Sequence, residues 1–415
     1  MSSVASTYAG RRVLPFVLIV ALFFLWGVAN NLNDVLIAHF KRLFTLSDFQ
    51  AGLVQSAFYL GYFCLAIPAA LFMRANGYRA AVLVGLLLYG AGALLFWPAA
   101  GAQSYPFFLL ALFVIASGLG FLETSANPLI ARLGDPERAS QRLNLAQAFN
   151  PLGSITGVLI GRSFILSGAP PTAEPLAATR ASEAAAVQLP YLAIALAVLG
   201  WAVLIRLTPF PDVATRSDVD EGVGAWADFR SLLRAPRLLA GVAAQFFYVG
   251  AQVGVWSFLI RYSQQAVPGT AERTAADYLT ASLVLFMVGR FAGAALMSRV
   301  RPLPLLSGFA GAAALCCLMA ALVGGGAGIA ALVASSFLMS VMYPTIFAEA
   351  VSGLGARTKS AAALLVMAIV GGAVFPAIMG LVSDAAGSMI RAMVVPALCF
   401  TVVALFGLLA GRLRP

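Results

Sequence analysis

The sequence predicts an all-α membrane protein with twelve transmembrane helices arranged as two six-helix, pseudo-symmetric halves. Three observations lead there: the composition, a series of long apolar segments and an internal repeat. Of the 415 residues, 61% are hydrophobic and only 10% are charged, whereas soluble domains carry about 25% charged residues. A soluble protein needs polar groups to cover much of its surface. We therefore expect this chain to have the lipid bilayer as its solvent.

The apolar segments are long enough to cross a membrane. A transmembrane helix needs about 20 mostly apolar residues, and the chain contains a dozen such stretches. The expected spans are residues 14–38, 51–73, 80–100, 105–131, 142–167, 188–208, 237–263, 276–299, 303–324, 328–351, 360–382 and 388–411.

Basic residues are concentrated in every second connection between these spans. Examples are Arg74 and Arg79, then Arg138 and Arg142, then Arg357. The positive-inside rule predicts that these connections, and with them both termini, lie in the cytoplasm. The net charge of +10 is then a signal of topology, and nucleic acid is not an expected partner.

A polar connector divides the chain into halves. Residues 209–236 are rich in charge and in turn-forming residues, as a solvated linker is, and they separate a half at 1–208 from a half at 237–415. Phe23–Gly27 ("FFLWG") aligns with Phe246–Gly250 ("FFYVG") at the first helix of each half. Two six-helix halves related by an axis along the membrane normal are the architecture of the major facilitator superfamily, whose substrate site lies near the membrane midplane.

Polar residues inside the first span point to a binding function. Asn30 precedes Asp34 by one helical turn, and Asn31 precedes it by three residues, so the three share a helix face. A charge at the centre of a span costs about 2.5–3.5 kcal/mol and is usually functional. We predict that this face binds a sugar-like ligand, whereas Asn33 points elsewhere and its role is not assigned.

The fourth and fifth spans carry similar polar faces. Glu123 is followed one turn later by Asn127 in "GLGFLETSANP", and "RLNLAQAFNPLG" places Asn144, Gln147 and Asn150 at a spacing of three. In an apolar bilayer such faces are expected to turn inward. Glu123, Asn127, Gln147 and Asn150 are therefore predicted to bind the substrate.

Asp34 and Glu123 are the candidates for carrying a proton. No basic residue lies deep in the same helices, and burial in a medium of low dielectric constant favours the neutral form of a carboxyl group. Such a group can exchange a proton near neutral pH, as coupling to a proton gradient requires. The alternative is that both carboxyl groups are neutral, hydrogen-bonded contacts between helices.

The second half offers aromatic residues and one amide. Tyr248, Gln252 and Trp256 follow one another at a spacing of four, and Tyr343 precedes Pro344. We predict that the aromatic rings stack on a sugar while the amide binds its hydroxyl groups. Interhelical packing is the alternative for the rings.

Other charges lie near helix ends. We expect Arg290, Arg299 and Arg301 to cluster at the cytoplasmic end of the eighth span and to gate or orient the transporter. Glu349, near the end of the tenth span, is expected to pair with one of them.

Several function classes lack their signatures. The sequence contains no G-x-x-x-x-G-K-[ST] nucleotide-binding loop, no metal-ligand cluster and no nucleophile–base constellation. We therefore expect neither an enzyme nor a bound cofactor or metal, with the proton as the coupling ion. A drug/proton antiporter is a rival of the same fold, but the asparagine and glutamine residues argue against it.

Six motifs resemble the fucose–galactose–glucose:proton symporter family of the major facilitator superfamily, most closely its bacterial L-fucose:proton symporter branch. They are "WGVANNLNDVLI", "GLGFLETSANP", "RLNLAQAFNPLG", "YVGAQVGVWSFLIRY", "MYPTIF" and "MGLVSDAAG". The resemblance implies that Asp34 and Glu123 are the protonation and sugar-binding pair, and that Gln147 and Asn150 line the sugar cavity. Glu349 departs from the family pattern, in which an uncharged residue is expected.

These observations together predict a monomeric, proton-coupled symporter of the bacterial inner membrane that imports a monosaccharide by alternating access. L-Fucose is favoured. A glucose, galactose or amino-sugar symporter of the same family is the alternative, because epimers differ by the position of a single hydroxyl group.

Overall fold

The computed structural model describes residues 14–28, 36, 40, 43–44, 48–132, 135–160, 184–210 and 225–413, and the regular elements in these ranges are helices. The helices that reach membrane-spanning length alone or in pairs are α2 (Asp48–Gly101), α3 (Tyr105–Arg132), α7 (Gln188–Leu207), α10 (Pro236–Ala266), α11 (Glu272–Leu296), α12 (Pro302–Leu322), α13 (Gly325–Met339) with α14 (Met342–Val351), α15 (Thr358–Met367) with α16 (Gly371–Ala386), and α17 (Met389–Ala392) with α18 (Val394–Leu409). Shorter elements are α4 (Ala139–Gln147), α5 (Phe149–Ile160) and α9 (Ala225–Leu232).

These helices match the predicted spans closely. Nine helical stretches of the described chain are long and apolar enough to cross a membrane. The first predicted span begins in the helix Leu14–Val28, and the fifth begins as α4 and continues as α5. The second and third spans both lie in α2, where Gly77 adopts φ 81° and ψ 169° and so breaks the helix in two. Glycine reaches positive φ without steric cost, which explains its place at this break.

The chain folds into two compact units. The first contains residues 1–129 and 152–221, and the second contains residues 130–151 and 222–415. Most of the predicted linker at 209–236 lies outside the described residues or in the short helix α9, so the division into sequence halves stays a prediction.

Close helix packing in the first unit depends on small residues. A side chain at Gly118 of α3 would collide with the backbone of Gly85 in α2, and one at Gly61 of α2 would collide with Ala116 of α3. Small residues let helix backbones approach in membranes, where lipid removes the hydrophobic drive to associate. α7 packs along α2, and the Phe96 and Tyr191 rings stack there at a centroid distance of 3.6 Å.

Hydrogen bonds made by tryptophan and tyrosine side chains hold the first helix against its neighbours. Trp26 Nε1 donates to Tyr62 Oη at 3.0 Å, and the hydroxyl group of Tyr89 donates to the carbonyl of Leu25 at 3.1 Å. Both partners come from α2. Trp201 Nε1 of α7 donates to the carbonyl of Leu18 at 3.1 Å. These contacts position the chain just before the motif that contains Asn30 and Asp34.

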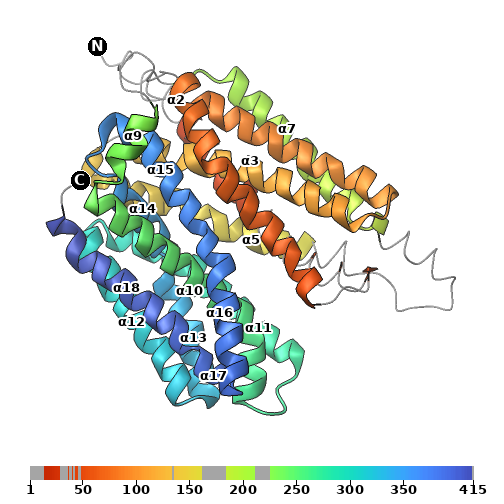
Figure 1. Ribbon diagram of the computed structural model, residues 1–415, viewed down its shortest axis with the longest axis vertical. Helices are drawn as coiled ribbons and strands as arrows, with labels where there is room; N and C mark the ends of the chain where they lie inside the picture. The colour runs from red at the N-terminus through yellow and green to blue at the C-terminus, as the bar shows by residue number, and fades with distance from the viewer. Residues whose placement is uncertain are drawn as a thin grey trace. The chain divides into compact units, whose positions relative to one another are not determined.

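In the second unit, α10 lies among several other helices (Figure 1). It packs against α16, α18 and α14, and α12 lies beside α18 and α13. Tyr248 and Tyr262 of α10 are fully buried, and their hydroxyl groups donate to the carbonyls of Met339 and Ala320 at 3.1 and 2.8 Å. The α4 helix also belongs to this unit and packs on α11 and α14.

We predict that Gly153→Ala lowers the thermal unfolding midpoint of the purified protein. A Cβ atom at Gly153 of α5 would collide with the carbonyl oxygen of Phe24 in the helix Leu14–Val28, and overpacking of this kind costs about 1–3 kcal/mol. Gly200→Ala in α7 is the control, because a Cβ atom there meets no atom within 4 Å. Equal unfolding midpoints for the two variants in detergent would contradict the prediction.

Candidate functional site

The first predicted site is the polar motif of the first span. Asn30, Asn31 and Asp34 lie outside the described residues, as does Asn33. What the structure shows is the helical turn before them, where Trp26 is 3% exposed and is held by Tyr62.

Glu123 lies in the interior of α3, as predicted. Its side chain is buried, and so are those of Thr124 and Asn127. Ser125 donates its hydroxyl group to the carbonyl of Phe121 at 2.7 Å, which satisfies it inside its own helix. α3 thus carries a buried carboxyl group and a buried amide one turn apart within an apolar span. Buried polar groups of this kind are expensive in a membrane and are usually functional.

The polar residues of α4 lie against α11 and α14. Ser140, Asn144 and Gln147 follow at spacings of four and three, so they share one helix face. Asn144 Nδ2 donates to the hydroxyl oxygen of Thr345 at 3.1 Å and lies 3.4 Å from the sulfur of Met297. Asn144 therefore ties α4 to α14 and to the end of α11.

Arg290 of α11 binds Gln147, which the sequence did not predict. Its Nη1 donates to Gln147 Oε1 at 2.7 Å and to the Gln147 carbonyl at 3.2 Å. The guanidinium carbon lies 4.7 Å from the centre of the Phe286 ring, and the residue is 4% exposed. A buried arginine is costly unless it is paired and hydrogen-bonded. These contacts therefore hold the amide group of Gln147 in one orientation.

The prediction that Arg290 clusters with Arg299 and Arg301 at the helix end is wrong. Arg290 is buried, whereas Arg299 and Arg301 are exposed. The sequence did contain a sign that Arg290 is buried. Arg290 lies before the end of α11 at Leu296, within an otherwise apolar stretch.

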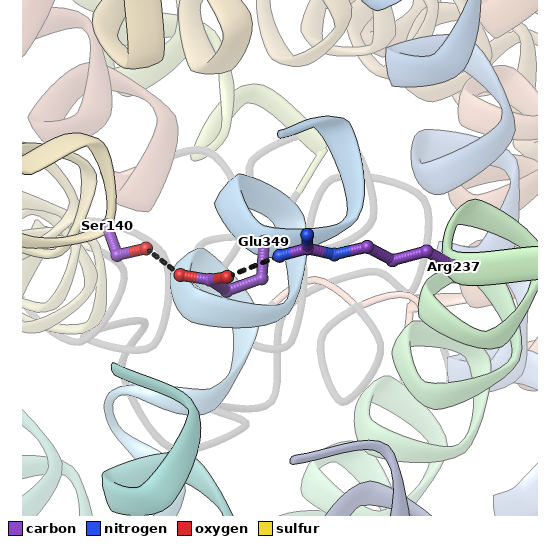
Figure 2. Close-up of polar contacts among 3 residues, drawn as sticks. All are labelled: Ser140, Arg237 and Glu349. Carbon is purple, nitrogen blue, oxygen red and sulfur yellow. Dashed lines mark hydrogen bonds and ion pairs between the residues drawn. The ribbon is translucent and has the colours of Figure 1, made fainter. Parts of the chain in front are cut away.

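Glu349 forms an ion pair, but with a different arginine from the ones expected. Arg237 Nη2 lies 2.7 Å from Glu349 Oε2, and Ser140 donates its hydroxyl group to Glu349 Oε1 at 3.1 Å. Figure 2 shows the carboxylate of Glu349 between these two side chains, each oxygen with its own partner. The expected pairing with Arg290, Arg299 or Arg301 was wrong because Arg237, in the first turn of α10, is the basic residue that reaches α14.

The aromatic residues of the second unit have structural contacts. The Tyr248 and Tyr343 rings meet edge to face at 6.4 Å, and Trp256 Nε1 donates to Ser336 Oγ at 3.1 Å. Trp256 and Gln252 are half-buried, as is Asn150 in α5. The predicted roles of these residues in sugar binding stay predictions.

Gln245 is a buried polar residue that the sequence analysis did not select. Its side chain is fully buried in α10, and neither Oε1 nor Nε2 has a hydrogen-bond partner among the described residues. It lies one turn before Tyr248. The feature of the sequence that could have identified it is an amide side chain within the apolar stretch Gly241–Gly250.

The chain matches known proteins over nearly its full length. The model of the Major Facilitator Superfamily matches residues 16–376. The L-fucose-proton symporter of Escherichia coli K12 is 46% identical over 404 residues, which cover 95% of this chain and 92% of that protein. The glucose/galactose transporter of Brucella abortus is 38% identical over 396 residues, covering 94% and 92%.

Solved structures agree with this assignment. The crystal structure of the transporter FucP in the outward conformation matches with a TM-score of 0.88 and 45% identity, covering 96% of this chain and 99% of that one. The proton:xylose symporter XylE matches with a TM-score of 0.68 at 13% identity, covering 96% and 94%, a likeness of fold alone. The all-helical structure, its apolar spans and these matches place the chain in one family: it belongs to the Major Facilitator Superfamily.

Proposed function

We propose that this protein is a proton-coupled symporter that imports a monosaccharide, with L-fucose as the favoured substrate. The observation that carries the proposal is the buried carboxyl group of Glu123 with Asn127 one turn later in a membrane span. A carboxyl group there can hold a proton, and amide groups beside it can bind sugar hydroxyl groups. The 46% identity to a protein named L-fucose-proton symporter supports the same substrate class.

In this proposal Glu123 is the principal proton carrier and Asp34 the principal sugar ligand. A proton from the periplasmic side neutralises one of the two, and the sugar then binds between the halves. Coupling of the two carboxyl groups is part of the proposal: interacting groups titrate as a unit, which would link proton and sugar binding through the pair. The halves then rock, the cavity opens to the cytoplasm, and sugar and proton leave.

Arg290 supports the sugar site in this scheme by orienting Gln147. Its guanidinium group donates to the carbonyl oxygen of the Gln147 side chain and so fixes which way that amide group faces. The proposal also includes a monomer in the bacterial inner membrane with both termini in the cytoplasm, for which the basic connections are the support.

We predict that Glu123→Gln abolishes sugar-driven proton movement while sugar exchange across the membrane is retained. Glutamine resembles the protonated carboxyl group in size and hydrogen bonding but cannot release a proton. The measurement is proton uptake in proteoliposomes upon sugar addition, with counterflow of labelled sugar alongside. Glu137→Gln, at an exposed acid in the connection after α3, is the matched control. Undiminished proton uptake in Glu123→Gln would exclude Glu123 as the proton carrier.

We predict that Arg290→Lys weakens sugar binding at least about tenfold, because loss of one charged hydrogen bond costs about 1.5–3 kcal/mol and 1.4 kcal/mol is tenfold in affinity. Lysine keeps the charge but cannot reach both the Gln147 oxygens and the Phe286 ring in the same way. Arg299→Lys, at an exposed site, is the control. Sugar titrations monitored by tryptophan fluorescence measure the affinity, and an unchanged affinity in Arg290→Lys would contradict the role of Arg290.

A panel of sugars decides the substrate. We predict that uptake of L-fucose exceeds uptake of glucose and galactose by about 5- to 150-fold, since a sugar whose hydroxyl groups are arranged differently leaves a buried polar group unpaired at a cost of about 1–3 kcal/mol. Uptake of labelled L-fucose, D-arabinose, galactose, glucose and an amino sugar is compared at two external pH values, and lower pH is expected to raise it. Preference for glucose or galactose would assign the chain to the alternative substrate. Export of an apolar cation instead would favour a drug/proton antiporter.

A further inference from the structure

Tyr62 of α2 is a buried residue that the proposed mechanism does not use. Its ring packs against the ring of Phe58 at a centroid distance of 5.5 Å. Its hydroxyl oxygen accepts the hydrogen bond from Trp26 Nε1 at 3.0 Å, and the hydroxyl group donates to no acceptor among the described residues. A tyrosine hydroxyl group can accept and donate at the same time. Its proton is therefore available to an acceptor nearby.

The packing of α2 on α3 places Tyr62 beside the helix face that carries Glu123. Ala116, Gly120 and Glu123 follow one another at spacings of four and three, so they share one face of α3. A Cβ atom added at Gly61 would lie 2.7 Å from the Cβ atom of Ala116, and one added at Gly120 would lie 3.4 Å from the Cα atom of Tyr62. This face of α3 therefore meets α2 at Tyr62, one turn before Glu123.

The side chains of Tyr62 and Glu123 are close enough to interact. Both are buried, and the charge of a Glu123 carboxylate acts on the Tyr62 hydroxyl group. Polar groups interact more strongly inside a protein than in water because the local dielectric constant is lower. The other titratable side chains near Tyr62 are Tyr59 and Tyr89, and tyrosine is neutral below about pH 10. Among the described residues, Glu123 is thus the neighbour of Tyr62 whose charge changes near neutral pH.

We propose that Tyr62, oriented by Trp26, is a positioning residue that stabilises the ionised form of Glu123 and so sets the pH at which this carboxyl group releases its proton. The inference rests on the proposed function, in which Glu123 carries the proton. When Glu123 loses its proton, the carboxylate becomes an acceptor for the hydroxyl proton of Tyr62. A hydrogen bond to the charged form of a group favours that form. Trp26 strengthens the effect, because a hydroxyl group that accepts one hydrogen bond becomes a better donor.

A proton carrier needs such a donor because it must release its proton as well as take one up. Burial in a medium of low dielectric constant favours the neutral form of a carboxyl group, and a carboxyl group that holds its proton too tightly cannot deliver it. The Tyr62 hydroxyl group opposes this effect of burial. Because tyrosine is itself neutral, it does so without a second charge inside the membrane, which would be costly.

The test follows the protonation of Glu123 itself, in the full-length protein in nanodiscs and without sugar. Infrared spectra across a pH series measure the band of protonated carboxyl groups, and the part of the band that is lost in Glu123→Gln belongs to Glu123. Each further variant is compared with its own Glu123→Gln derivative.

We expect Tyr62→Phe, which keeps the ring but removes the hydroxyl group, to raise the midpoint of this titration by about one to two pH units. The ionised form of Glu123 loses its donor, so the proton is held to a higher pH. A shift of this size is a change in proton affinity of about ten- to hundredfold, the range that a hydrogen bond to a charged group supplies.

Two further variants make the result specific. Tyr89→Phe removes a buried hydroxyl group from the same helix, but that group donates to the carbonyl of Leu25, so the midpoint is expected to stay at the parent value. Replacement of Tyr62 by a fluorinated tyrosine keeps the ring and makes the hydroxyl group a stronger donor, so the midpoint is expected to fall. The fluorinated variant also keeps the test decisive if Tyr62→Phe fails to fold.

Three results would overturn this role of Tyr62. They are a midpoint that does not rise in Tyr62→Phe, a rise of equal size in Tyr89→Phe, and shifts in the same direction in both Tyr62 variants, because lost packing would then be the cause. Counterflow of labelled L-fucose in proteoliposomes separates this proposal from the proposed function. If the midpoints shift as expected while the parent moves no sugar, the transport proposal fails and the role of Tyr62 stands.

Discussion

Lipid offers no hydrogen bonds to a polar group inside a membrane-spanning helix, so each such group must find a partner within the protein or line a polar cavity. The structure depends on how this requirement is met. In the second unit, long side chains of one helix reach polar groups of another: Arg290 binds Gln147, Asn144 binds Thr345, and Trp256 binds Ser336. Because few such groups exist in a chain with 10% charged residues, each of them constrains where a whole helix can lie.

The same requirement explains why tyrosine and tryptophan side chains hold neighbouring helices together in this protein. Tyrosine and tryptophan combine a large apolar body with a single donor, so they pack among apolar side chains and still bind a backbone carbonyl. Tyr89 and Trp201 hold the first helix in this way, and Tyr248 and Tyr262 hold α10. Tyr248 is fully buried, and its hydroxyl group is used inside the protein.

α4 is held in place by contacts of its polar face. By sequence it begins the fifth span of the N-terminal half, yet in the structure it packs in the second unit, on α11 and α14. Its polar face meets a carboxylate, a hydroxyl group and a guanidinium group in turn. These contacts tie α4 to α14 and α11.

Much about this protein could be read from its sequence. The apolar spans, the all-helical class and the family follow from composition and motif, since a bilayer permits few architectures and since polar residues such as Glu123 stand out against an apolar background. The partners of those polar residues could not be read in this way. Arg290 was grouped with Arg299 and Arg301, and Glu349 was paired with the wrong arginine, because nearness along the chain says little about which helices pack together. Only the tertiary structure decided that Gln147 meets Arg290 and that Glu349 meets Arg237 and Ser140, because those contacts depend on the rotation and crossing of helices that are more than a hundred residues apart.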